Sequence, residues 1–292
     1  MRIRESMGSQ AFTVFNYILL LFVALSMALP FIYVMAGSFT SQAELTQKRI
    51  VLIPVKPTLA AYRLIMSSKM ILTGMGSSIL ITVIGTAINI VMTTMMAYPL
   101  SKKHLMGRSW LQKMVVFTML FNAGMIPTYM VVRMTGMIDS YWALWIPTAI
   151  SAFNLILMRN FFEQIPDEIE EAAKVDGCND LQTLVRIVLP LSKPALAAFS
   201  LFYAVAHWNN YFRAIMFINT PAKWPIQVWL RQIIILAQSD FAAEVNADLL
   251  IETPPETVKL AVIVVACIPI MMVYPFLQKH FTKGILLGSV KG

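Results

Sequence analysis

A charge-dense island interrupts the apolar second half of this sequence: Glu171-Ala172-Ala173-Lys174-Val175-Asp176-Gly177. The polar segment ends with Ile187-Val188-Leu189-Pro190, which begins ten residues after the glycine. Long apolar runs lie on either side of it, and a chain that only crosses a membrane has no structural need for an island at that place. The stretch therefore predicts a docking surface that takes force from a soluble partner.

The composition places the rest of the chain in a membrane. Of the 292 residues, 58% are hydrophobic and only 13% are charged, and the mean hydropathy is +0.69. A soluble domain would carry about twice that charged fraction. The apolar residues come in runs near or above the ~20 residues that cross a bilayer as a helix, and the alternating pattern of a membrane β-barrel is absent. We therefore expect an all-α, multi-pass membrane protein.

Six apolar runs are long enough to be transmembrane helices. The first follows Arg2 and Arg4, and we interpret it as a retained helix because a secretory signal has a shorter core and a small-residue cleavage site. The six predicted spans are residues 12–36, 71–99, 111–132, 141–160, 194–217 and 258–278.

The charges of the short loops predict the orientation. The loop between the second and third spans holds Lys102, Lys103 and Arg108, whereas the next loop holds Arg133 balanced by Asp139. Basic loops stay in the cytoplasm, so the first of these loops is expected to be cytoplasmic. Six spans then place both termini and the charge-dense island on that side.

The island is expected to fold as two short helices joined at a glycine. Pro166 suits the first turn of a helix, and the acidic residues after it suit the positive end of the helix dipole. Gly177 ends this helix in a left-handed conformation, Asn179 or Asp180 caps the second helix, and Pro190 ends it. An amphipathic connector that rests on lipid headgroups is the alternative interpretation.

The sequence lacks the motifs of catalysis and of nucleic-acid binding. No Gly-x-x-x-x-Gly-Lys-Ser/Thr loop for phosphate and no zinc-protease or hydrolase motif occurs. The net charge of +8 comes from basic residues scattered through loops, not gathered on one face as nucleic acid requires. Cys178 and Cys267 are too few for a metal cluster. We expect no catalytic site, metal or cofactor in this chain.

Polar residues in the predicted spans are candidates for a transport pathway, because polar groups in hydrocarbon usually face a cavity or another helix. Hydrogen bonding between helices is the alternative for any single asparagine. Arg213 has no Asp or Glu within a span to pair with, and a guanidinium binds carboxylates through two parallel hydrogen bonds; a snorkelling, structural arginine is the alternative. Gly124 and Pro127 predict a bend. The candidate pathway residues are Asn122, Asn154, Trp208, Asn209, Asn210 and Arg213.

The spacing Glu-Ala-Ala, three residues, Gly, nine residues, Ile-x-Leu-Pro resembles the signature loop of permease subunits of binding-protein-dependent ABC importers. It precedes the last two spans, as in that family. The stretches Trp208–Phe212, Phe217–Asn219 and Gln278–Gly284 resemble its carbohydrate branch, in the group for complex oligosaccharides that includes alginate-type importers.

The resemblance implies the type I importer permease fold, with six transmembrane helices and a cytoplasmic coupling helix seated in a groove of an ATPase. It divides the chain into residues 1–70, with the first helix and an external loop, the transmembrane domain 71–280 with the coupling loop at 161–193, and the cytoplasmic tail 281–292. The residues that it implies for ATPase coupling are Glu170, Glu171, Ala172, Ala173, Asp176 and Gly177.

The resemblance also implies partners and a location. These are a second, non-identical permease, two ABC ATPase subunits that bind ATP and magnesium, and an extracytoplasmic solute-binding protein, all at the cytoplasmic (inner) membrane of a bacterium. The external segment 218–257 resembles the loop that reaches the binding protein, although an interfacial helix anchored by tryptophans is the alternative. Its candidate contacts are Trp224, Gln227, Trp229 and Arg231.

The expected function is import of oligosaccharides, with acidic ones indicated by Arg213. A secondary transporter or channel would be expected to carry a buried acidic relay, but every Asp and Glu lies in a loop or terminus. A membrane-embedded enzyme would need a catalytic pair at membrane depth, and none is evident. The alternative that the sequence distinguishes least well from an oligosaccharide importer is an importer of the same type for peptides or another solute.

Overall fold

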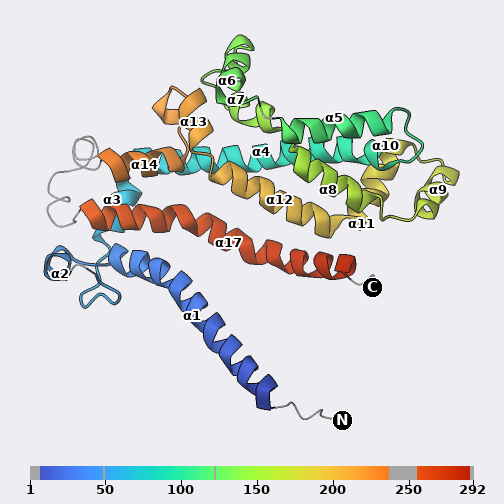
Figure 1. Ribbon diagram of the computed structural model, residues 1–292. Helices are drawn as coiled ribbons and strands as arrows, with labels where there is room; N and C mark the ends of the chain where they lie inside the picture. The colour runs from blue at the N-terminus through green and yellow to red at the C-terminus, as the bar shows by residue number, and fades with distance from the viewer. Residues whose placement is uncertain (1–6, 49, 122, 237–254, 290–292) are drawn as a thin grey trace. The chain divides into compact units, whose positions relative to one another are not determined.

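The structure is a computed structural model that describes residues 7–48, 50–121, 123–236 and 255–289. In these ranges every regular element is a helix (Figure 1). The first half contains α1 (Met7–Ser38), α2 (Gln42–Gln47), α3 (Ala60–Ser67), α4 (Lys69–Ser101), α5 (Arg108–Leu120), α6 (Met125–Met134), α7 (Trp142–Trp145) and η1 (Ile146–Thr148). The second half contains α8 (Ala152–Phe162), α9 (Asp167–Val175), α10 (Asp180–Thr183), η2 (Leu184–Val188), α11 (Leu189–Leu191), α12 (Lys193–Trp208), α13 (Phe212–Phe217), η3 (Pro221–Lys223), α14 (Ile226–Leu236) and α17 (Pro255–Ser289).

Three helices among the described residues, α1, α4 and α17, are long and apolar enough to cross a bilayer as single rods. The number rises to six when each of three bent pairs counts as one span. These pairs are α5 with α6, α7–η1 with α8, and α10–α11 with α12. The predicted all-α, multi-pass fold is confirmed.

Three of the predicted spans are interrupted: 111–132, 141–160, which bends by 54° between η1 and α8, and 194–217. In the first and the last of these the residues at the break explain it. The span predicted at 111–132 leaves its helix after Leu120 and resumes behind Gly124, whose φ of +84° favours glycine. The bend predicted at Gly124 is therefore confirmed, whereas the candidate pathway residue Asn122 lies outside the described residues. The prediction of one helix over 194–217 is wrong. Helix α12 ends at Trp208, because the asparagines that follow are poor helix formers that compete for backbone hydrogen bonds.

Contacts between residues divide the chain into two compact units, which we describe separately. The first contains α1, α2, α3, α14 from Gln232 and α17 up to Cys267. Within it the Ser38 hydroxyl lies 2.7 Å from the Tyr62 hydroxyl. The buried Glu44 carboxylate accepts the Val55 amide at 2.9 Å, which folds the connection between α2 and α3 back onto α2.

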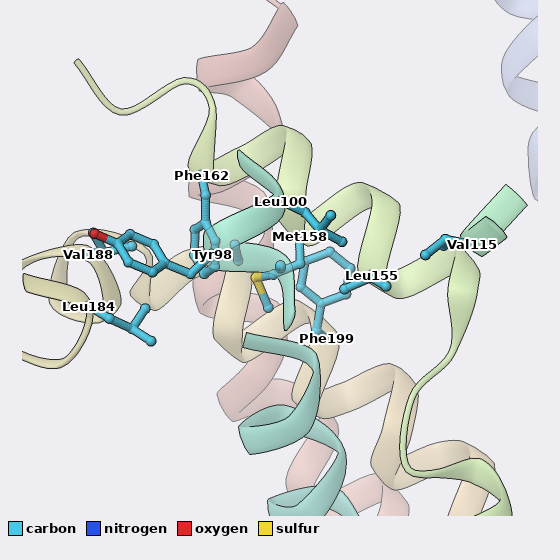
Figure 2. Close-up of a cluster of buried hydrophobic side chains, with 11 residues drawn as sticks. Tyr98, Leu100, Val115, Leu155, Met158, Phe162, Leu184, Val188 and Phe199 are labelled. Atoms are coloured by element: carbon cyan, nitrogen blue, oxygen red, sulfur yellow. The ribbon is translucent and has the colours of Figure 1, made fainter. Parts of the chain in front are cut away.

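The second unit contains α4 from Met70, the helices from α5 to α13, α14 up to Arg231, and α17 from Ile268. Its larger apolar cluster surrounds the Ser101 end of α4 (Figure 2). There Tyr98 meets Phe162 of α8 edge-on, with ring centres 6.4 Å apart, and Val188 of η2 is fully buried beside them. At membrane depth, close packing holds such a cluster together, because lipid tails are as apolar as the side chains.

Helix α4 is tied to its neighbours by polar contacts along its length. In the first half of α4, Trp145 of α7 donates its indole N–H to the Ile81 carbonyl at 3.1 Å. In the middle, Asn89 Oδ1 lies 2.6 Å from His207 Nε2, and Thr93 Oγ1 lies 2.8 Å from the Tyr203 hydroxyl, both on α12. The second unit is thus organised around α4.

Candidate functional site

The charge-dense island forms a capped helix, α9, that ends as predicted. Three acidic residues lie in its first turn and Lys174 lies in its last. Gly177 follows with a φ of +82°. The Cys178 amide donates to the Ala173 carbonyl at 2.9 Å, and the Gly177 amide donates to Lys174 at 3.0 Å. These are the two bonds of a Schellman motif, so the predicted role of Gly177 as a left-handed helix terminator is confirmed.

The second helix of the island begins at Asn179, one of the two predicted caps. The Gln182 amide donates to Asn179 Oδ1 at 2.8 Å, and the Gln182 side chain accepts the Asn179 amide at 3.0 Å. This reciprocal pair is a capping box. The prediction that Pro190 ends the helix is wrong, because the chain stays helical to Leu191. A π turn over Leu184–Val188 precedes the proline and leaves room for its ring in the helix.

The six residues predicted for ATPase coupling separate into two sets. Glu170 and Ala173 are buried against the chain itself, at 7% and 3% exposed. The other four, Glu171, Ala172, Asp176 and Gly177, are exposed. Together with the exposed Lys174 and Val175 they form the surface that we call the coupling surface.

Glu170 anchors α9 to the Ser101 end of α4. Its carboxylate forms an ion pair with Lys102 and accepts the Tyr98 hydroxyl at 3.3 Å. The Lys102 ammonium also lies 4.6 Å from the centre of the Tyr98 ring. A second carboxylate, Glu163 at the end of α8, pairs with Arg159 at 2.7 Å and with Arg108. The sequence analysis treated Lys102 and Arg108 only as loop charges, because no periodicity in the sequence indicates carboxylate partners that lie 68 and 55 residues further along the chain.

The polar cluster predicted for the pathway assembles only in part. Asn210 is buried, and its Oδ1 accepts the Arg213 Nε–H at 3.2 Å. Arg213 has no carboxylate partner among the described residues. Two buried nitrogens near this pair, Asn210 Nδ2 and His207 Nδ1, also have no hydrogen-bond partner in the described part of the chain. The break between α12 and α13 therefore presents the Arg213 guanidinium and the Asn210 amide N–H as donors, with no carboxylate paired to them among the described residues.

The other candidate pathway residues lie in different surroundings. Asn154 is buried on α8, where its backbone amide donates to Oγ of Ser151, the N-cap residue of that helix, at 3.5 Å. Asn209 is exposed at the end of α12. Trp208 is buried and lines an apolar groove of about 640 Å³ between α4, α12 and α17. The sequence analysis did not single out Asn89, whose signal was a lone amide in the middle of an apolar span.

The segment after α13 forms a surface that we call the α14 platform, residues 218–231. Trp229 is buried on α4 at 9% exposed, and the Trp224 ring lies 5.0 Å from it. Gln227 is half-buried. Arg231 is exposed, donates to the Tyr211 hydroxyl, and lies 4.6 Å from the centre of that ring. Of the four predicted binding-protein contacts, the structure therefore gives Trp229 the position of an anchor.

Asp139 fastens the α14 platform to the connection between α6 and α7. Its carboxylate accepts the Thr220 hydroxyl at 2.6 Å, the Thr220 and Asn219 amides at 2.9 and 3.0 Å, and the Lys223 ammonium at 3.0 Å. The Thr220 hydrogen bonds, followed by Lys223, hold the pKa of Asp139 well below its usual range. The sequence analysis used Asp139 only to balance Arg133.

The metal-ligating side chains of the described residues do not cluster. No group of three or more His, Cys, Asp or Glu side chains among them is arranged to hold a metal ion. Cys178 and Cys267 are free thiols.

A multi-pass membrane chain whose described elements are all helices, and which carries an anchored, charged helix between its apolar spans, has the architecture of a transport permease. The chain belongs to the family of binding-protein-dependent transport system inner membrane components, whose profile matches residues 105–286. It is a permease subunit of an ABC importer, in which ATP binding lies with partner ATPases. The predicted family, the permease function and the multi-pass inner-membrane location are confirmed.

Three similar proteins cover nearly the whole chain. One is the polygalacturonan/rhamnogalacturonan transport system permease protein YtcP of Bacillus subtilis (strain 168), 53% identical over 98% of this chain and 100% of that protein. Protein LplC of the same organism is 51% identical over 98% of this chain and 96% of its own. A chain in the crystal structure of a bacterial ABC transporter involved in the import of the acidic polysaccharide alginate is 39% identical, with a TM-score of 0.90 over 96% of this chain and 99% of that chain.

Proposed function

We propose that this chain lines half of the pathway of an importer for acidic oligosaccharides. The observation that carries the proposal is Arg213, a guanidinium that is held by Asn210 and has no carboxylate partner among the described residues. A cargo carboxylate would supply that partner as it passes. YtcP is named for polygalacturonan and rhamnogalacturonan, and the transporter of 39% identity is described as importing alginate. All three polysaccharides contain uronic acids.

The proposed orientation places the coupling surface in the cytoplasm and the α14 platform outside. The basic residues Lys102, Lys103 and Arg108 follow α4 at the end that contacts α9, and such residues favour the cytoplasm. Both chain termini would then be cytoplasmic. In this orientation the coupling surface meets an ATPase and the α14 platform meets the solute-binding protein.

The complete importer would contain a second, non-identical permease, two ABC ATPase subunits and the binding protein. The exposed coupling surface supports one ATPase contact per permease. The apolar groove between α4, α12 and α17 supports a neighbour at membrane depth. Closure of the ATPases on ATP would push α9 and switch the pathway from inward-facing to outward-facing.

The cargo proposal is tested by uptake of size-matched uronate and neutral oligosaccharides in cells that carry the complete importer. Arg213→Gln should lower uronate uptake about tenfold, which is the effect of losing one charged hydrogen-bonded contact, and should leave neutral uptake nearly unchanged. Arg213→Lys should keep part of the uronate uptake. The matched control is Arg133→Gln, which removes an exposed charge at the end of α6.

The two cargoes discriminate between charge recognition and a structural arginine. If Arg213→Gln lowers uptake of both saccharides to the same degree, or of neither, Arg213 does not recognise charge. If the wild type prefers neither saccharide over the other, the acidic class is wrong while the permease function stands.

A further inference from the structure

One helix, α4, contacts both surfaces for which docking is proposed. At its Lys69 end, the buried Ser78 hydroxyl accepts the amide of Ile226, the first residue of α14, at 2.8 Å. At its Ser101 end, Tyr98 and Lys102, the residue that directly follows α4, hold Glu170 of α9. Figure 1 shows α14 and α9 near opposite ends of α4.

The contact with α14 is made through a glycine. A Cβ atom added at Gly74 would lie 2.5 Å from Trp229 Cδ1 and 3.4 Å from the Ile226 Cα. Trp229 is 9% exposed and Ile226 is fully buried, so neither can turn aside as a flexible side-chain tip would. Helix α14 is thus seated directly on the backbone of α4. Gly76, two residues further along, is different, because nothing lies within 4 Å of a Cβ added there.

Between these ends α4 is one continuous helix of 33 residues. At 1.5 Å per residue it spans about 50 Å, more than the ~30 Å of a hydrocarbon core. Its single proline, Pro99, lies in the last turn. A helix held along its length moves as a body, so a displacement at one end reaches the other.

We infer that α4 is the strut that transmits binding-protein docking on the α14 platform to the coupling surface, and that Gly74 is a positioning residue that sets the seat of α14. Gly74 lies against Trp229 and Ile226 of α14. It acts through Trp229, whose place against α4 fixes the height and angle of the platform. The inference rests on the proposed function, since it takes the platform to meet the binding protein and α9 to meet the ATPase.

The experiment measures ATP hydrolysis by the complete importer in proteoliposomes, titrated with binding protein and saturating oligosaccharide. Gly74→Ala should lower the maximal stimulation about fivefold, the small end of a typical coupling between sites. The basal rate and the half-saturating concentration of binding protein should stay unchanged. Gly76→Ala is the matched control, with the same added methyl group on the same helix, and should behave as wild type.

A double-mutant cycle tests whether the effect runs through Trp229. Valine ends at Cγ and so lacks the Cδ1 atom that a residue at position 74 would meet. In a Trp229→Val background, Gly74→Ala should therefore cost no further stimulation. If the Gly74→Ala complex does not assemble, Ser78→Ala decides the matter, because it removes the bond to Ile226 without adding an atom. It should lower maximal stimulation in the same way.

Several results would overturn the inference. These are full stimulation of Gly74→Ala, an equal loss in Gly76→Ala, a shift in half-saturating concentration alone, a proportional loss of basal and stimulated rates, or an unchanged effect in the Trp229→Val background. If the Gly74→Ala complex does not assemble, full stimulation of the Ser78→Ala complex would also overturn the inference. Failure of the proposed function looks different, since the wild-type complex would then show no stimulation by any binding protein.

Discussion

Replacing Glu170 by glutamine should loosen α9 without changing the rest of the fold. Glu170 is 7% exposed and pairs with Lys102, whose side chain is 16% exposed. Removal of one partner from a fully buried pair costs about 3–5 kcal/mol, and the partial exposure of Lys102 and the amide that remains reduce this to about 2 kcal/mol. Opening of α9 should therefore become about thirtyfold more frequent.

Hydrogen exchange of the α9 amides in the purified importer measures this opening directly. Glu171→Gln is the matched control, since its carboxylate is exposed one residue away and should leave α9 exchange at the wild-type rate. Glu170→Gln combined with Lys102→Met should exchange more slowly than Glu170→Gln alone, because no charge is then left buried without a partner. Equal exchange in Glu170→Gln and Glu171→Gln would refute the anchoring role of Glu170.

Two further predictions concern the orientation and the α14 platform. In a chain whose native cysteines are replaced, a cysteine at Lys174 should be shielded from an impermeant thiol reagent added to intact cells, and one at Arg231 should react; the opposite labelling would overturn the orientation. Asp139 has a lowered pKa in the folded chain, so its stabilising contribution is complete above the usual carboxyl pKa of about 4 and is lost only as the pH falls below that range. Protease resistance of residues 218–223 should therefore be constant between about pH 5 and 8 in the wild type, and Asp139→Asn should lower it throughout; a loss of resistance in the wild type near pH 6 would contradict this.

The features that the sequence predicted correctly depend on neighbours along the chain. Apolar run length indicated the membrane helices, and a glycine after a helix-favouring stretch indicated the left-handed terminator at Gly177. Asn179 was identified as one of two caps for the same reason. Each of these signals needs only a few residues of context.

The features that the sequence did not predict depend on distant partners. Glu170 and Glu171 are adjacent and chemically identical, and only the fold distinguishes the buried anchor from the exposed residue. Trp229 is a surface candidate by composition but is buried because Gly74 gives it a place on α4. Asp139 meets partners about 80 residues away, which no periodicity shows.

Val175 on the coupling surface has a consequence for biogenesis. It is the last residue of α9, is 88% exposed and lies between the charged residues Lys174 and Asp176, and Leu181 is 62% exposed close by in the sequence. Apolar side chains left in water are what proteases and chaperones recognise on incomplete assemblies. A permease made in excess of its ATPase would leave these apolar side chains exposed, and docking on the ATPase as proposed would cover them. Synthesis in balanced amounts is thus favoured by the same surface for which ATPase coupling is proposed.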